Sequence, residues 1–149
     1  MKETQMGGKD GRVTLLVREV ATRISAKESL VDEILAALAR DEWICGDDQL
    51  RVRMALDEAI TNAMLHGNRM DARKVVRIEV FAERERWGIL IEDEGEGFGK
   101  EELPDPEDPA NLLREGGRGV MMMKGFMDDV RFLGRGNQVQ MTRRRTPLA

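Results

Sequence analysis

Apolar residues recur along the chain with two different periods, and the shorter period predicts strands. Residues 12–20 are rich in β-branched and aliphatic side chains, which favours a strand. In residues 74–82 aliphatic side chains alternate with charged ones and Phe81, as in a strand buried on one face. Residues 87–92 form the next apolar run, and the charged residues 83–86 before it are typical of a turn. These two runs therefore predict a hairpin.

The longer period, with apolar residues three or four positions apart, predicts two amphipathic helices. The first covers residues 25–43; it begins at a capping box formed by Ser25 and Glu28 and is broken by Gly46. The second covers residues 47–66 and is ended by the Gly-Asn pair that follows. Its apolar stripe consists of Val52, Leu56, Ala59, Ile60 and Ala63.

Residues 95–119 differ from the rest of the chain because they are rich in Gly, Pro and acidic residues, with one short helical candidate at 109–114. A connection of this length is uncommon in a compact domain and is usually functional, often as a lid. After it, residues 119–128 predict a helix, and two strands flank residues 134–137. The whole order predicts an α+β fold with helices packed on one face of a sheet.

Length and composition fit one folded domain, residues 1–149, with its core in about 12–142. Hydrophobic residues make up 41% and charged residues 35%, the balance of a globular protein. The net charge of −4 argues against a dedicated nucleic-acid-binding protein, whose binding face is usually basic. Residues 143–145 are three arginines, and a basic tail this short predicts a solvated end.

Other features narrow the location of the protein. The lone cysteine, Cys45, excludes an intramolecular disulfide and a zinc site of several cysteines, and its apolar surroundings predict a half-buried, inert thiol. The longest apolar run, residues 34–39, is far shorter than the roughly 20 residues of a membrane span. Residues 1–12 lack the apolar stretch of a signal peptide. We therefore expect a cytoplasmic protein without a membrane anchor.

Glu58 and Asn62 are the polar groups of the second predicted helix that could carry chemistry. They are four residues apart, so they project from one face of the helix, one turn above the other. A carboxylate and a carboxamide in this arrangement could position a hydroxyl group and ligate a hard cation through oxygen. The same spacing also fits an ordinary solvated helix face. The lone histidine, His66, is interpreted as a helix-end residue that favours the dipole.

Two glycine-rich segments form the other candidate sites. Asp93 follows a predicted strand and precedes Gly95 and Gly97, which gives a fixed acceptor beside a backbone open to a planar ligand, although such turns are also common structural features. Residues 116–120 lead into a helix, where unpaired N–H groups favour a phosphate. Arg118 could add a charge-assisted contact. A hinge before a core helix is the alternative for this second segment.

The order of these three segments resembles the GHKL, or Bergerat-fold, ATPases. LDEAITNAMLHGN resembles their N box, DEGEG their first glycine box and GGRGVMMMKGFMDDV their second. The length, the EAxTNAxxHG pattern and the Phe-Met-Asp-Asp after the second box make the chain most similar to the anti-sigma-factor serine kinases. The resemblance implies a two-layer sandwich, with a mixed, mostly antiparallel sheet, helices on one face and an ATP lid.

The resemblance also implies roles for individual residues. Glu58 would be the base that acts on an acceptor serine, Asn62 would ligate Mg²⁺, and Asp93 would accept a hydrogen bond from the adenine amino group. Gly95 and Gly97 would shape the base pocket. The residues placed along the ATP phosphates are Gly117, Arg118, Gly119 and Val120.

The implied function is an ATP-dependent serine kinase and anti-sigma factor that phosphorylates an anti-anti-sigma (STAS) protein. The alternative is a nucleotide-dependent module that sequesters or activates a partner with little kinase turnover. Sensor histidine kinases fit less well, since they need a dimerisation segment for which there is no room before Arg12. The resemblance further suggests a homodimer formed through the first strand and helix, with no direct nucleic-acid partner.

Overall fold

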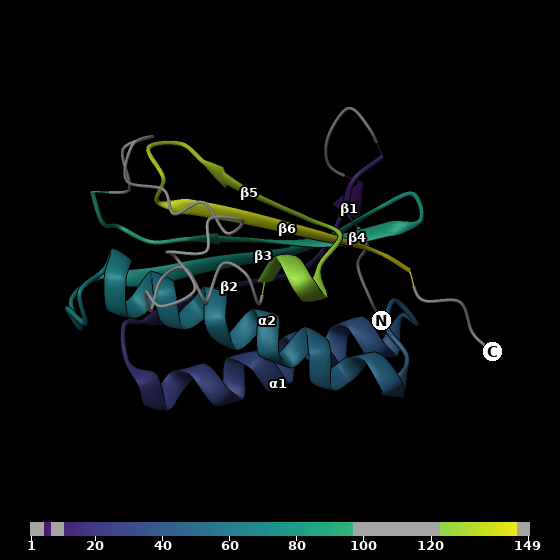
Figure 1. The fold of residues 1–149 in the computed structure, drawn as a ribbon, viewed down its shortest axis with the longest axis horizontal. Helices are drawn as coiled ribbons and strands as arrows, with labels where there is room; N and C mark the ends of the chain where they lie inside the picture. Colours follow the sequence, from purple (N-terminus) through teal and green to yellow (C-terminus); the bar gives the residue numbers. More distant parts are fainter. Residues whose placement is uncertain (1–4, 7–10, 97–122, 146–149) are drawn as a thin grey trace.

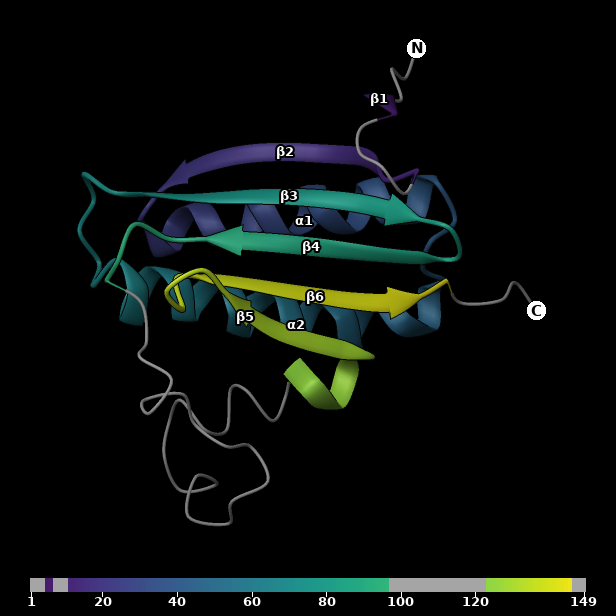
Figure 2. The same ribbon diagram turned by 90° about the horizontal axis from the view of Figure 1, so that it is seen from above.

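The structure is a computed structural model that describes residues 5–6, 11–96 and 123–145. Six strands form one sheet in the order β1-β2-β3-β4-β6-β5, and every pairing among the described strands is antiparallel (Figure 2). The strands are β1 (Gln5–Met6), β2 (Val13–Ala21), β3 (Val75–Glu83), β4 (Arg86–Glu92), β5 (Asp129–Leu133) and β6 (Gln138–Arg144). The predicted α+β class and the predicted hairpin of β3 and β4 are therefore confirmed.

Two helices lie side by side on one face of this sheet (Figure 1). They are α1 (Ile24–Arg40) and α2 (Gln49–Asn62); a short 3₁₀ turn, η1 (Gly46–Asp48), precedes α2, and a π-helical turn, η2 (Ala63–Gly67), follows it. Residues 123–126 are helical, in the range where a helix was predicted. Among the described residues, none of the helices combines the length and the apolar character that crossing a bilayer requires.

The core lies between the helices and the inner face of the sheet. Val76, Ile78 and Val80 are fully buried there, as the alternation in β3 predicts. Phe81 was expected on the polar face of the strand and does point outward, yet it is 2% exposed. The Arg12 guanidinium covers its ring at 3.8 Å, and the absent side chain of its cross-strand partner Gly88 leaves room for it.

The ends of α1 differ from the prediction. Its N-cap is Arg23, with no side-chain hydrogen bond, so the predicted capping box at the start of the helix is wrong. The helix stops six residues before Gly46, because Glu42 adopts a left-handed conformation with φ of 62°. The N–H of Glu42 then donates to the Ala39 carbonyl and that of Trp43 to the Leu38 carbonyl, as in a Schellman motif. The breaker is therefore a non-glycine residue.

The basic tail is part of the fold, and its prediction as a solvated end is wrong for two of its three arginines. Arg143 lies opposite Trp87 on the inner face of the sheet and donates from Nη2 to Asp48 Oδ1 at 2.9 Å. The guanidinium of Arg145 stacks 3.8 Å from the centre of the Trp43 ring. Cys45, predicted as a half-buried thiol, is half-buried and donates to the same Asp48 carboxylate at 3.4 Å. The arginines thus join the last strand to the loop before α2.

Candidate functional site

The candidate site lies where the end of α2, the end of β4 and the β5–β6 turn come together. Asn62, Gly67, Asp93 and Asn137 line a narrow cavity of about 30 Å³ there. A purine ring needs more space than this, so a bound state requires part of the wall to move. Met123 forms one wall, and its flexible thioether side chain is suited to such an adjustment.

Asp93 is fixed on both sides of its peptide by one residue of the β5–β6 turn. Its N–H donates to the Asn137 carbonyl at 2.9 Å, and its own carbonyl accepts from Asn137 Nδ2 at 3.1 Å. The side chain is 9% exposed, and its Oδ1 accepts the N–H of Gly95 at 2.8 Å. Oδ2 has no hydrogen-bond partner among the described residues and is therefore available as an acceptor for a ligand.

Burial raises the pKa of the Asp93 carboxyl above its ordinary value. The hydrogen bond from the Gly95 N–H and the positive charge of Arg135 act in the opposite direction, and the effect of burial exceeds them. A buried acceptor with a raised pKa at the edge of a cavity is a common feature of functional sites.

Two glycines allow the chain to approach the Asp93 carboxylate. A Cβ on Gly67 would overlap both carboxylate oxygens, and a Cβ on Gly95 would overlap the Gly67 carbonyl. Gly95, which was expected to shape a base pocket, lies next to Asp93 and Gly67, and both of these residues line the cavity. Both positions thus exclude any side chain while Asp93 keeps its place.

Replacing Gly67 by Ala should therefore lower the free energy of unfolding by about 1–3 kcal/mol, the usual cost of an added group in a filled space. Gly46 is the matched control, because a Cβ there meets nothing within 4 Å. Gly46→Ala should change the stability by less than about 0.5 kcal/mol. Equal midpoints for the two variants in urea unfolding would contradict the close approach at Gly67.

Glu58 and Asn62 lie one turn apart on α2, as the spacing predicts. Both are half-buried, and neither side chain has a hydrogen bond or ion pair with another described residue. Asn62 lines the cavity, whereas Glu58 lies one turn earlier in α2, toward the N-terminus of the helix, and does not line it. Their free oxygen atoms suit a hard cation that also binds phosphate oxygens. The described residues contain no cluster of three or more His, Cys, Asp or Glu able to hold a metal.

The π turn after Asn62 was not expected from the periodicity. The N–H of Asn68 donates to the carbonyl of Ala63, five residues earlier, at 2.8 Å. A π turn accommodates one more residue than an α turn, and such turns are frequent at functional sites. Here it brings Gly67 against Asp93, while Asn62 still faces the cavity from the last position of α2.

Several predicted site residues lie outside the described part of the chain. These are Gly97, Gly117, Arg118, Gly119 and Val120. Most of the predicted lid, residues 95–119, lies there as well.

Two contacts of the β5–β6 turn were missed by the sequence reasoning. Arg135 donates from Nε and Nη2 to the Gly95 carbonyl, at 3.1 and 2.8 Å, and Asn137 holds the Asp93 peptide as described above. The available signal was the turn sequence Gly-Arg-Gly-Asn, in which Gly134 and Gly136 both have positive φ. A turn of this kind places its polar side chains in fixed positions.

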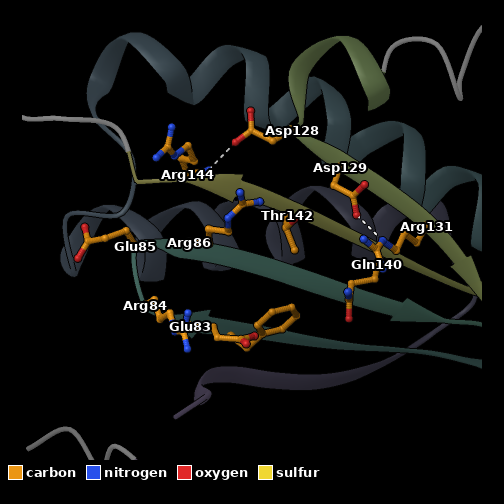
Figure 3. A pocket seen from close by; sticks show the side chains of 11 residues that line it. Glu83, Arg84, Glu85, Arg86, Asp128, Asp129, Arg131, Gln140, Thr142 and Arg144 are labelled. Carbon is orange, nitrogen blue, oxygen red and sulfur yellow. Dashed lines mark hydrogen bonds and ion pairs between the residues drawn. The ribbon is translucent and has the colours of Figure 1, made fainter. Parts of the chain in front are cut away.

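A larger hollow, of about 770 Å³, lies elsewhere, on the face of the sheet that the helices leave uncovered (Figure 3). Charged side chains line this hollow. They include Arg86 and Arg144, which face each other on β4 and β6, and the ion pair of Arg131 with Asp129 on β5. None of the predicted site residues that the structure describes lines it. The candidate site is therefore assigned to the smaller cavity at Asp93.

Comparison with known proteins identifies the family of the chain. The family described as histidine kinase-like ATPase domain matches residues 10–143, nearly the whole chain. The chain belongs to this family. The described residues that line the cavity at Asp93 all lie inside the matched range.

Among curated relatives of this ATPase domain, the chain is 31% identical over 116 residues to a serine-protein kinase RsbW of Bacillus licheniformis, covering 73% of this chain and 72% of the relative. It is 29% identical over 119 residues to an anti-sigma F factor of Anoxybacillus flavithermus, covering 77% and 80%. A serine-protein kinase RsbW of Oceanobacillus iheyensis is 34% identical over 86 residues, which is 54% of either protein. The chain thus spans only about half the length of that relative.

A solved structure supports the fold of the domain. The crystal structure of the RsbU and RsbW domains of a Mycobacterium tuberculosis protein superposes with a TM-score of 0.60 and 16% sequence identity. The match covers 87% of this chain and 31% of that one. At this identity the likeness shows the fold alone, and it agrees with the arrangement of sheet and helices in Figure 1.

Proposed function

We propose that this chain is an ATP-dependent serine kinase and anti-sigma factor of the cytoplasm, which transfers the γ-phosphate of ATP to a serine of an anti-anti-sigma (STAS) protein. The family match and the names of the relatives support the ATP-dependent kinase class. The observation that carries the proposal is the buried Asp93 carboxylate, with one oxygen bound to Gly95 and the other free at the cavity. A carboxylate is an acceptor only, so it selects a ligand with a donor, such as the adenine amino group.

The residues present fit a magnesium nucleotide. Asn62 offers an amide oxygen at the cavity, and a backbone site for phosphates is proposed at residues 117–120. Bound Mg-ATP would supply the phosphoryl group and the cation that neutralises its charge. The part of this chain is to bind the base through Asp93, to hold the cation through Asn62 and to orient the acceptor hydroxyl.

Glu58 is assigned as the general base. Its carboxylate is half-buried, has no partner among the described residues, and lies one helical turn from Asn62. A base in this position takes the proton of the incoming serine hydroxyl at Oε. No covalent bond between the protein and the phosphoryl group is needed, because catalysis of this transfer relies on positioning and on charge stabilisation.

A phosphotransfer assay tests the proposal. The chain is mixed with a candidate STAS protein and Mg-ATP, and the phosphate on the acceptor serine is measured by mass spectrometry. Multiple turnovers support the kinase. Nucleotide-dependent complex formation without turnover would instead support the alternative, a switch module that binds its partner.

Affinity for ADP should fall at mildly acidic pH. Because burial raises the pKa of Asp93, this carboxyl becomes protonated at a higher pH than an exposed aspartate, and the neutral form is a weaker acceptor. The raised pKa also means that the ionised Asp93 carboxylate lowers the free energy of unfolding at a pH above this pKa. Protonation at lower pH removes this destabilisation. Calorimetric titrations of ADP from neutral to acidic pH measure the effect. In Asp93→Asn the affinity for ADP should be weak, and it should not change with pH in this way.

We also propose a homodimer formed through the first strand and helix of the domain. Among the described strands, only β1, which has two residues, lies between β2 and this edge of the sheet. Val17 in β2 is 40% exposed, which leaves apolar surface at this edge. A sheet edge of this kind is suited to pairing with a second chain.

A further inference from the structure

Asn68 occupies an unusual position between two strands. β3 and β4 pair as far as Arg77 and Glu92, so in a continued ladder Val76 would face Asp93 and Val75 would face Glu94. Instead, the Glu94 N–H donates to Asn68 Oδ1 at 2.7 Å, and Asn68 Nδ2 donates to the Val75 carbonyl at 3.0 Å. The side-chain amide of Asn68 thus stands where a direct bond between the strands would form.

The amide is held from a third side. Its Nδ2 also donates to Thr22 Oγ1 at 2.8 Å, and the Thr22 hydroxyl in turn donates to the Lys74 carbonyl at 2.7 Å. Asn68 is fully buried, and its amide atoms Oδ1 and Nδ2 make three hydrogen bonds, to Glu94, Val75 and Thr22. Of the side chains of this length, only asparagine carries both a donor and an acceptor amide group. Aspartate at this position would lack the donor for the bonds to Val75 and Thr22, and leucine could make none of the three hydrogen bonds.

We propose that Asn68 is a positioning residue for base recognition: its amide separates the ends of β3 and β4 and thereby keeps Asp93 in the cavity. Glu94, whose N–H is held by Asn68, directly follows Asp93. Without the amide, the Val75 carbonyl and the Glu94 N–H are left to pair with each other. That extends the ladder by two facing pairs, Val76 with Asp93 and Val75 with Glu94, and draws the Asp93 carboxylate away from Gly67. This inference rests on the proposed role of Asp93 in binding adenine.

The test compares ADP with inosine diphosphate, whose base carries an oxygen acceptor in place of the adenine amino donor. A carboxylate held at that position prefers ADP. In Asn68→Ala we expect ADP affinity to fall about 10- to 100-fold, since the displaced carboxylate no longer makes its charge-assisted hydrogen bond to the amino group. The affinity for inosine diphosphate should change much less, so the ratio of the two affinities falls. Calorimetry well below the melting temperature of each variant gives both affinities.

Thr22→Val is the matched control. It removes one of the three partners of Asn68 and is also buried, but it leaves the bonds to Val75 and Glu94 in place. We expect a lower melting temperature and an affinity ratio within about twofold of the unmodified protein. Should Asn68→Ala fail to fold, Asn68→Ser is used instead, because its hydroxyl can bond to only one strand end and the ratio should fall in the same direction.

The outcomes separate two failures. A normal affinity ratio in the Asn68 variants, with only a lower melting temperature, overturns the positioning role and leaves the proposed function standing. If the unmodified protein binds ADP and inosine diphosphate equally, base recognition by Asp93 is itself wrong, and both proposals fall. A ratio that falls in Asn68→Ala but not in Thr22→Val supports the positioning role.

Discussion

Replacing Glu58 by Gln is expected to slow phosphate transfer to the partner serine by about 10²–10⁴-fold, with ADP affinity nearly unchanged. The amide has the shape of the carboxylate but cannot accept the proton of the hydroxyl at neutral pH. Glu58 does not line the cavity at Asp93 and has no partner among the described residues, so the substitution disturbs neither the base site nor the fold. Single-turnover phosphorylation of the STAS partner, with ADP calorimetry beside it, measures both quantities.

The neighbouring carboxylate provides the control for this experiment. Asp57 precedes Glu58 on α2, and its Oδ1 lies 3.8 Å from Lys27 Nζ in a partly exposed ion pair. Asp57→Asn removes the same charge from the same turn of helix, and the transfer rate should stay within about threefold, since Asp57 faces Lys27 of α1 and does not line the cavity. Equal rates for Glu58→Gln and the unmodified protein would exclude Glu58 as the base.

The second large effect is expected for the ion pair between the last strand and the start of α2. Arg143→Ala should lower the free energy of unfolding by about 3–5 kcal/mol, because it breaks a largely buried ion pair with Asp48. The side chains of the pair are 16% and 9% exposed, so water screens them little. Arg143 also donates to the Phe126 carbonyl at 3.1 Å, and that bond is lost too. Urea unfolding gives the change in free energy, and a fall in melting temperature of roughly 10 °C should accompany it.

An exposed arginine–aspartate pair serves as the reference for Arg143. Arg131 and Asp129 are in contact at 2.7 Å, but their side chains are 68% and 40% exposed. Arg131→Ala should therefore cost no more than about 1 kcal/mol. Equal losses in the two variants would show that burial does not decide the strength of these pairs. The double variant Arg143→Met with Asp48→Leu should recover much of the stability, since it replaces both charges of the pair by apolar groups.

Features set by neighbouring residues could be predicted from the sequence. The alternation in residues 74–82 fixes which side chains of β3 face the core, and the spacing of Glu58 and Asn62 places them on one face of α2. Asp93 was found because it follows a strand and precedes glycines. The roles of Glu58, Asn62 and Asp93 in binding and transfer remain predictions.

The features that could not be predicted depend on residues far apart in the chain. Asn68 contacts Glu94, 26 positions later, and Arg135 contacts Gly95, 40 positions earlier. Arg143 pairs with Asp48, which lies 95 positions earlier in the chain, and no local sequence pattern distinguishes Arg143 from a solvated tail residue. The end of α1 was misplaced for a different reason, because Glu42 adopts a left-handed conformation that glycine usually provides.

The order of the strands affects how the protein is made. β6 is the last strand of the chain, yet it lies between β4 and β5 in the sheet, and the turn before it supplies the bonds that fix the peptide of Asp93. During synthesis on the ribosome these bonds can form only after residues 137–144 have left the exit tunnel. A growing chain that stops earlier has α2 and Asp93 but no finished pocket. Completion of the candidate site is thereby confined to chains whose translation has passed this point.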